Sequence, residues 1–225
     1  MEKEIIEFLD KEYKQSFAFA FEYLDRRKDK VITKEIMYNT LERASTLTRW
    51  DVYCEIMKSR KVTRAAAIEG YKLAIENGES DFRAVLLYNQ QGFTINEMLR
   101  SKKERKVWQS LPDKITLYRG CSKNELNFEE ENCFGISWTF NRQIAEIFAF
   151  GGNKQNRAVF SIEVCKEDIK AILLERNEDE VLFFDGNGFT YDVERFQMVT
   201  DRPTEYYNDY IKTEDNKRKI YEKSA

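Results

Sequence analysis

Apolar residues recur at steps of three and four in the first half of the chain, which is typical of amphipathic helices. The stripe from Ile5 to Leu24 predicts one long helix at the start of the chain. Further helices are predicted at about residues 34–44, 47–59, 63–77 and 81–90. The motif Thr94-Ile-Asn-Glu97 predicts a helix that begins with a capping box and runs toward Leu111. Residues 1–111 are therefore expected to form a helical lobe.

After Pro112 the apolar residues alternate with polar ones, which is typical of strands. Strands are predicted at residues 115–118, 135–139, 158–164, 171–174, 181–184 and 189–193. Asn141 is a good N-cap for one helix that follows the second of these strands. The charged tail, residues 204–225, has tyrosines at helical spacing and predicts a surface helix. Residues 112–203 are therefore expected to form a strand-rich core.

Histidine is absent from the 225 residues, and this restricts the chemistry that the chain can perform. Ser/His/Asp hydrolysis, Cys/His proteolysis and histidine-based zinc hydrolysis all need an imidazole as base or ligand. The four cysteines lie twelve or more residues apart, so no Cys-x-x-Cys pair exists, and they are expected to be small buried residues. Any chemistry is expected to rest on carboxylates, arginine and hydroxyls, without a metal.

The formal net charge of −3 argues against a nucleic-acid binder that works by bulk charge, although a local basic groove stays open. The apolar runs are too short for a membrane helix. The acidic start MEKEIIEFLDKE lacks the basic and then apolar layout of a signal peptide. A cytoplasmic protein with no membrane partner is expected.

Two segments of the strand-rich part combine a strand with polar side chains. Leu117-Tyr-Arg-Gly120 ends a predicted strand with an arginine and a glycine, which suits bidentate binding of a phosphate. In Ser137-Trp-Thr139, alternation puts both hydroxyls on one face of the strand and Trp138 on the other. Each segment alone is also typical of ordinary structure, because surface arginines are often solvated and hydroxyl residues are common in strands.

A third segment is the acidic cluster that precedes the strand predicted at residues 181–184. Glu178 and Glu180 are two positions apart, so they project to the same side if strand geometry has already begun there. A solvated acidic turn is the alternative interpretation of the same residues.

Together, the order and flanks of the three segments resemble the mono-ADP-ribosyltransferases of the arginine, serine, glutamate class. This family includes bacterial toxins, phage enzymes and vertebrate ectoenzymes. The matching residues are Tyr118-Arg119-Gly120, Ser137-Trp138-Thr139 with Ala145 and Phe148-Ala149, and Glu178-Asp179-Glu180-Val181-Leu182. The resemblance covers about residues 113–200 and departs from the family at Ser-Trp-Thr, where Ser-Thr-Ser is commoner. It implies an α+β fold, in which a helical lobe precedes a mixed sheet arranged as a two-sheet β-sandwich.

The resemblance implies that the chain uses NAD as substrate and breaks the bond between nicotinamide and ribose. Positive charge builds on the sugar in such a reaction, and Glu180 would stabilise it. Ser137 would fix the rotamer of Glu180, and Thr139 would support the same strand. Arg119 would hold the pyrophosphate, and the backbone of Gly120 would bind the nicotinamide amide.

Three further residues follow from the same resemblance. Glu178 would orient or deprotonate the acceptor, and an acid at that place goes with arginine as acceptor in this family. Phe150 and Arg157 flank a polar loop and are candidate NAD contacts; an ordinary surface loop is the alternative interpretation.

The implied activity is transfer of ADP-ribose to a macromolecule, with protein arginine as the expected acceptor. A phage-type modifier of host machinery, acting in the host cytoplasm, would fit such a chain. An NAD glycohydrolase remains an alternative, as does a catalytically silent protein-binding module of the same fold. A nucleic-acid partner is not expected, and the sequence does not indicate an oligomeric state.

Overall fold

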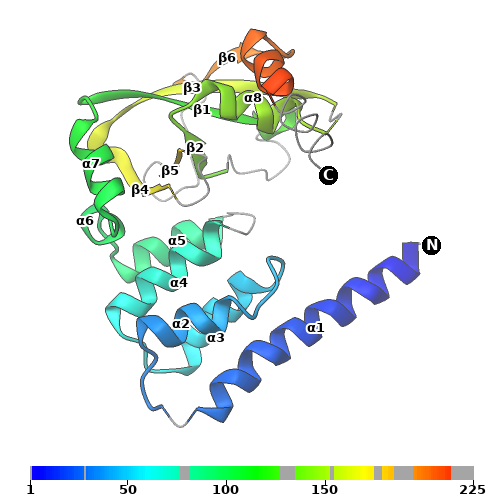
Figure 1. Ribbon diagram of the computed structural model, residues 1–225, viewed down its shortest axis with the longest axis vertical. Helices are drawn as coiled ribbons and strands as arrows, with labels where there is room; N and C mark the ends of the chain where they lie inside the picture. The colour runs from blue at the N-terminus through cyan, green and yellow to red at the C-terminus, as the bar shows by residue number, and fades with distance from the viewer. Residues whose placement is uncertain are drawn as a thin grey trace, which may run out of the picture. The chain divides into compact units, whose positions relative to one another are not determined.

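A computed structural model describes residues 2–27, 29–76, 82–126, 135–152, 155–174, 179–184 and 195–213. The chain forms two compact units, Met1–Ser80 and Asp81–Ala225, which are described separately (Figure 1). The boundary expected near residue 111 marks the change from helices to strands, which the structure places at Lys114. The compact units divide earlier, because the last three helices of the first half belong to the same unit as the strands.

The first unit consists of helices, as the apolar periodicity predicts. They are α1 (Glu2–Arg26), α2 (Lys34–Leu41), α3 (Arg49–Ser59) and α4 (Arg64–Glu76). Three buried aromatic rings form part of the core, with centroids 5.8 Å apart for Trp50 and Tyr53 and 6.0 Å apart for Trp50 and Tyr71. The Tyr53 hydroxyl donates to the carbonyl of Ala67 at 2.8 Å, and burial raises the pKa of Tyr53. The rings meet at a tilt or edge to face, which aromatic pairs prefer over a face-to-face sandwich.

The second unit begins with α5 (Phe82–Gln91), α6 (Ile95–Met98) and α7 (Lys102–Ser110). The prediction of one helix from Thr94 toward Leu111 is wrong, because the chain leaves helical geometry at Leu99. Thr94 and Glu97 do form the predicted capping box. A second capping box, Ser101 with Glu104, then starts α7, and the Glu104 carboxylate accepts from the backbone of Ser101 at 2.9 Å. Two start signals seven residues apart along the sequence therefore give two short helices.

The six described strands form one antiparallel sheet in the order β4-β5-β2-β1-β3-β6. Their bounds are β1 (Lys114–Ser122), β2 (Ser137–Thr139), β3 (Arg157–Cys165), β4 (Ile169–Leu173), β5 (Glu180–Phe183) and β6 (Gln197–Thr200). The α+β class is confirmed. The expectation of a mixed sheet is wrong for the described strand pairs, and these strands form a single sheet where a two-sheet sandwich was expected. The strand predicted at residues 189–193 lies outside the described residues.

Helix α8 (Arg142–Phe150) packs against β1 and β3, as Figure 1 shows. It begins where the sequence predicts, since the Asn141 side chain accepts from the backbone of Gln143 at 2.9 Å. Residues 205–213 form a further helix next to it, in agreement with the predicted surface helix. The fully buried Glu146 of α8 holds this segment, because its carboxylate accepts from the backbone and hydroxyl of Thr204 and pairs with Arg142. A buried carboxylate is stable only with such partners.

The cysteines differ in environment. Cys121 is buried as expected and Cys54 is half-buried, but Cys165 is exposed, so the prediction of burial is wrong there. Cys165 is the last residue of β3, and over the final four residues of that strand burial alternates, so its side chain falls on the solvent side. Cys133 lies outside the described residues.

Among the helices that the structure describes, none has the length and apolar character needed to cross a membrane.

Candidate active site

The pairing of β2 with β5 brings Ser137 and Glu180 together across 43 residues of sequence. Thr139 stands opposite Glu180 in the antiparallel register, so Ser137, two positions along the strand, shares a face with that carboxylate. The Ser137 hydroxyl donates to Glu180 Oε1 at 2.6 Å. Only 7% of Glu180 is exposed. The site therefore holds a nearly buried carboxylate in one rotamer through a charge-assisted hydrogen bond.

Arg119 of β1 joins the same group through the backbone of β2. Its Nη1 donates to the carbonyl oxygen of Ser137 at 2.7 Å. Gly135 makes room for the guanidinium, since a Cβ added there would lie 2.1 Å from Arg119 Nη2. Gly135 was not among the residues predicted for the site, although a glycine at the start of a strand is a signal for close approach. Arg119, Ser137 and Glu180 correspond to the arginine, serine and glutamate after which the resembling class is named, and these contacts connect all three.

Gly120, the next residue of β1, lies against the backbone of α8. A Cβ added to Gly120 would lie 1.8 Å from the carbonyl oxygen of Ala145 and 2.6 Å from the amide of Ala149. Only glycine permits this contact without moving the helix. Arg157, which was a candidate NAD contact, donates to the carbonyls of Gly120 at 3.4 Å and Phe148 at 3.1 Å. Arg157 therefore connects β3, β1 and α8 beside the site.

The remaining residues of β2 are placed as strand alternation predicts. Trp138 is 2% exposed, and its ring stacks on Phe196 with centroids 5.7 Å apart and meets the edge of Phe183 at 6.2 Å. The Thr139 hydroxyl accepts from the backbone of Asn141 at 3.0 Å. Thr139 thus shapes the turn from β2 into α8 as well as standing opposite Glu180.

Glu178 lies outside the described residues, so the structure places only one carboxylate of the predicted pair. Asp179 has a φ of +46°, in the left-handed region, and its carbonyl accepts from the backbone of Phe140 at 3.3 Å. Strand β5 begins after it, at Glu180. Glu178 and Glu180 were expected to project to one side only if the backbone between them is extended, and the backbone at Asp179 is not. Non-glycine residues in this conformation cluster at functional sites.

Phe150, the other candidate NAD contact, packs against the C-terminal segment. Its ring meets that of Tyr207 edge to face at 6.2 Å, and its carbonyl accepts from the Tyr207 hydroxyl at 3.4 Å. The structure thus joins Phe150 to the helix at residues 205–213.

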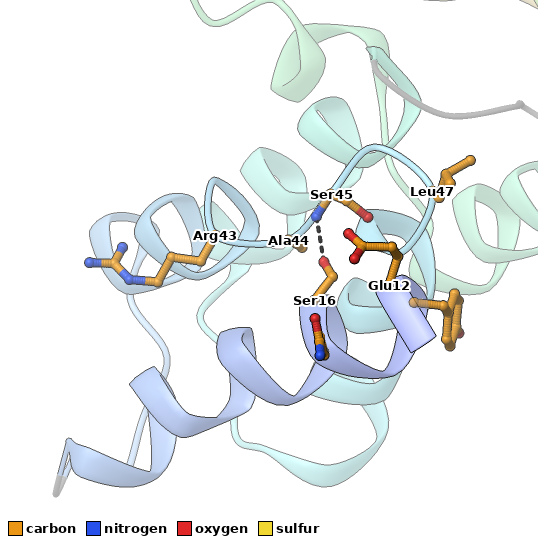
Figure 2. A pocket seen from close by; sticks show the side chains of 8 residues that line it. Glu12, Ser16, Arg43, Ala44, Ser45 and Leu47 are labelled. Carbon is orange, nitrogen blue, oxygen red and sulfur yellow. Dashed lines mark hydrogen bonds between the residues drawn. The ribbon is translucent and has the colours of Figure 1, made fainter. Parts of the chain in front are cut away.

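A cavity of about 500 Å³ lies elsewhere, in the first unit, between α1 and the loop at residues 43–47 (Figure 2). Its lining combines the carboxylate of Glu12, the hydroxyls of Ser16 and Ser45 and the exposed side chain of Leu47. Ser16 accepts from the backbone of Ser45 at 2.7 Å, so part of its polar lining is used to hold α1 against the loop. The cavity contains none of the residues predicted for catalysis.

Among the residues that the structure describes, no group of three or more cysteine, aspartate and glutamate side chains is arranged to hold a metal ion. The strand expected to end at Gly120 continues to Ser122, so Gly120 lies within β1. The positioned functional groups are one carboxylate, one hydroxyl, one guanidinium and the backbone of this glycine. This set is suited to stabilising positive charge beside a bound anion. Comparison of the chain with models of known families, with curated proteins and with solved structures finds no match.

Proposed function

We propose that the chain is an NAD-dependent mono-ADP-ribosyltransferase with Glu180 as its catalytic carboxylate. One observation carries the proposal: Ser137 donates to Glu180 at 2.6 Å while Arg119 reaches the carbonyl of the same serine at 2.7 Å. The three residues come from three different strands, and the sequence motifs of the resemblance include all three. Side chains that are merely solvated are not expected to form such a connected set.

Glu180 would stabilise the ribose cation that forms as the bond to nicotinamide breaks. Its low exposure supports this role, because a charge with little water around it interacts more strongly with a nearby cation. Ser137 would keep the carboxylate in the productive rotamer. The acceptor nitrogen would then bond to the ribose carbon that nicotinamide left, and the acceptor proton would pass to a carboxylate or to water.

Arg119 would bind the pyrophosphate through its planar fork of donors. Gly120 would present its backbone to the nicotinamide amide, and the α8 contacts and Arg157 would keep that backbone in place. The proposal takes protein arginine as acceptor from the resemblance at Glu178, which lies outside the described residues. A guanidinium is a poor nucleophile until a nearby carboxylate orients it or takes its proton.

The test is incubation of the purified chain with NAD and an arginine-rich acceptor protein. Released nicotinamide reports cleavage, and label on the acceptor reports transfer. Glu180→Gln should lower both by about a hundredfold or more, the scale for loss of one preorganised charge. Glu167→Gln, which changes an exposed carboxylate elsewhere in the unit, is the matched control and should keep full activity.

Glu178→Gln separates the two readouts, since transfer should be lost while slow release of nicotinamide persists. Cleavage without transfer in the unaltered chain, tested also with lysate proteins, would establish a glycohydrolase instead. No consumption of NAD under either condition, or full activity in a folded Glu180→Gln protein, would overturn the proposed mechanism.

A further inference from the structure

The segment at residues 100–106 concentrates positive charge in a chain that is acidic as a whole. It holds Arg100, Lys102, Lys103, Arg105 and Lys106 against the single acid Glu104, a net charge of +4, whereas the whole chain carries −3. Glu104 is 2% exposed and its carboxylate accepts from backbone amides at the start of α7. The one acid of the segment is therefore turned away from solvent, and the surface of the segment is positive.

The geometry of α7 puts its basic residues on one face. At about 100° per residue, Lys102, Lys103, Arg105 and Lys106 fall within an arc of about 160°. The opposite arc holds the residues that pack inward or are half-buried, namely Glu104, Val107, Trp108 and Leu111. All four basic side chains are exposed, and they span only about 6 Å along the helix axis.

The lysines of this face have no acidic partner among the described residues. No described carboxylate forms an ion pair with Lys102, Lys103 or Lys106, although other exposed lysines of the same unit, such as Lys114 and Lys123, are paired. Lys166 contacts the opposite arc, since its Nζ lies 5.1 Å from the centroid of the Trp108 ring and donates to the carbonyl of Leu111 at 3.0 Å. The exposed positive face is therefore formed by the residues of α7 themselves.

The composition of this face distinguishes between two kinds of acidic partner. Interfaces with proteins bury apolar and aromatic side chains at their centre and are depleted in lysine. The large exposed hydrophobic side chains of the described residues all lie outside α7. Lysines without exposed apolar neighbours instead suit phosphates, which are contacted as point charges and without regard to sequence.

We propose that the outer face of α7, formed by Lys102, Lys103, Arg105 and Lys106, binds the phosphate backbone of nucleic acid. Successive phosphates of one strand rise by about 3.4 Å along a duplex, so a charged face about 6 Å long meets more than one of them at once. The acidic remainder of the chain keeps this binding weak and confined to one place. The binding does not depend on NAD or on the chemistry at Glu180.

The experiment measures binding of the full chain to a fluorescent 20-base-pair DNA duplex of mixed sequence by anisotropy, at 50 to 200 mM KCl. The variant Lys102→Gln/Lys103→Gln/Lys106→Gln keeps Arg105, whose Nη1 donates to the carbonyl of Leu99 and supports the fold. The matched control, Lys30→Gln/Lys58→Gln/Lys61→Gln, removes three exposed lysines of the first unit and makes the same change in net charge.

If each of the three lysines contacts a phosphate, their contacts account for about a fortyfold loss of affinity in the unaltered chain between 50 and 200 mM salt. Removing them should lower the slope of log affinity against log salt concentration by about 2.7. The α7 variant should bind at least tenfold more weakly at 50 mM KCl, and the control should bind within twofold of the unaltered chain. Equal weakening in both variants would mean that bulk charge alone drives binding and would overturn the proposal. Competition by poly-glutamate as effective as by unlabelled duplex would assign the face to an acidic protein instead.

Discussion

Ser137→Ala is the most informative single change in the candidate site, because it deletes one hydroxyl and leaves the Glu180 carboxylate in place. The hydroxyl donates to Glu180 Oε1 at 2.6 Å, and Glu180 is only 7% exposed. Water therefore replaces the lost donor poorly, and the carboxylate loses one of the contacts that hold its rotamer. The change tests whether Ser137 positions Glu180 for catalysis.

The size of the effect follows from the kind of hydrogen bond that is lost. A hydrogen bond to a charged group contributes about 1.5 to 3 kcal/mol. Each 1.36 kcal/mol in the barrier is tenfold in rate, so loss of positioning should lower kcat for nicotinamide release by about tenfold to a hundredfold. The KM for NAD should change little, since Arg119 and Gly120 would supply the binding contacts to the phosphates and the amide.

The assay compares kcat and KM for nicotinamide release in Ser137→Ala, Ser137→Thr and Ser161→Ala. Ser137→Thr keeps a hydroxyl and should recover much of the rate. Ser161 is a buried serine of β3, on the far side of β1 from the β2–β5 pair, and its loss should leave kcat within twofold. A Ser137→Ala protein that is folded and keeps kcat within twofold would refute the positioning role, as would equal losses in both serine variants.

Two further predictions test the surroundings of the site. Gly120→Ala should lower the free energy of unfolding by about 3 kcal/mol, the upper end for overpacking, because the new Cβ would lie 1.8 Å from the carbonyl oxygen of Ala145; a denaturant titration that finds no loss would contradict this packing. The Lys123 ammonium donates to Asp201 at 3.0 Å and lowers the pKa of that carboxyl. The pair therefore stabilises the fold above the pKa of the carboxyl in the unfolded chain, near pH 4. This stabilisation is lost as the pH falls further through the lowered pKa of Asp201 in the folded chain. Carboxyl titration by NMR should give a higher pKa for Asp201 in Lys123→Met, and an unchanged value would show that the ion pair does not form in solution.

Local signals were sufficient to predict most elements of the fold. The start of α8 follows from the Asn141 cap, and β1, β3, β4 and β5 follow from alternation or short apolar runs bounded by polar residues. The break between α6 and α7 was also present in the sequence as the capping box Ser101 to Glu104. No glycine or proline separates the two helices, so the sequence carries a second start signal without a stop signal before it. The edge strand β6 has only exposed and half-buried residues, so its apolar pattern is weak.

The strand order could not be predicted in the same way. It depends on which distant strands pair, and β2 with β5 or β1 with β3 are pairs that no local pattern specifies. The sequence placed Ser137 and Glu180 together only through a resemblance of motifs, and the structure then brought them within hydrogen-bond distance. Gly135 was missed because its purpose, space for Arg119, exists only once β1 and β2 are side by side.

The candidate site depends on the three residues of β2, and each of them has a separate structural task. Ser137 binds Glu180 with its side chain and Arg119 with its carbonyl, whereas Trp138 packs into the core on the opposite face. In a strand, a slip of one residue exchanges the two faces. Such a slip would remove the indole of Trp138, which is 2% exposed, from its contacts with Phe183 and Phe196 and would put a hydroxyl in its place. The burial of Trp138 therefore fixes the register that holds Ser137 against Glu180, and the tryptophan that departs from the commoner Ser-Thr-Ser motif supports the site from its far side.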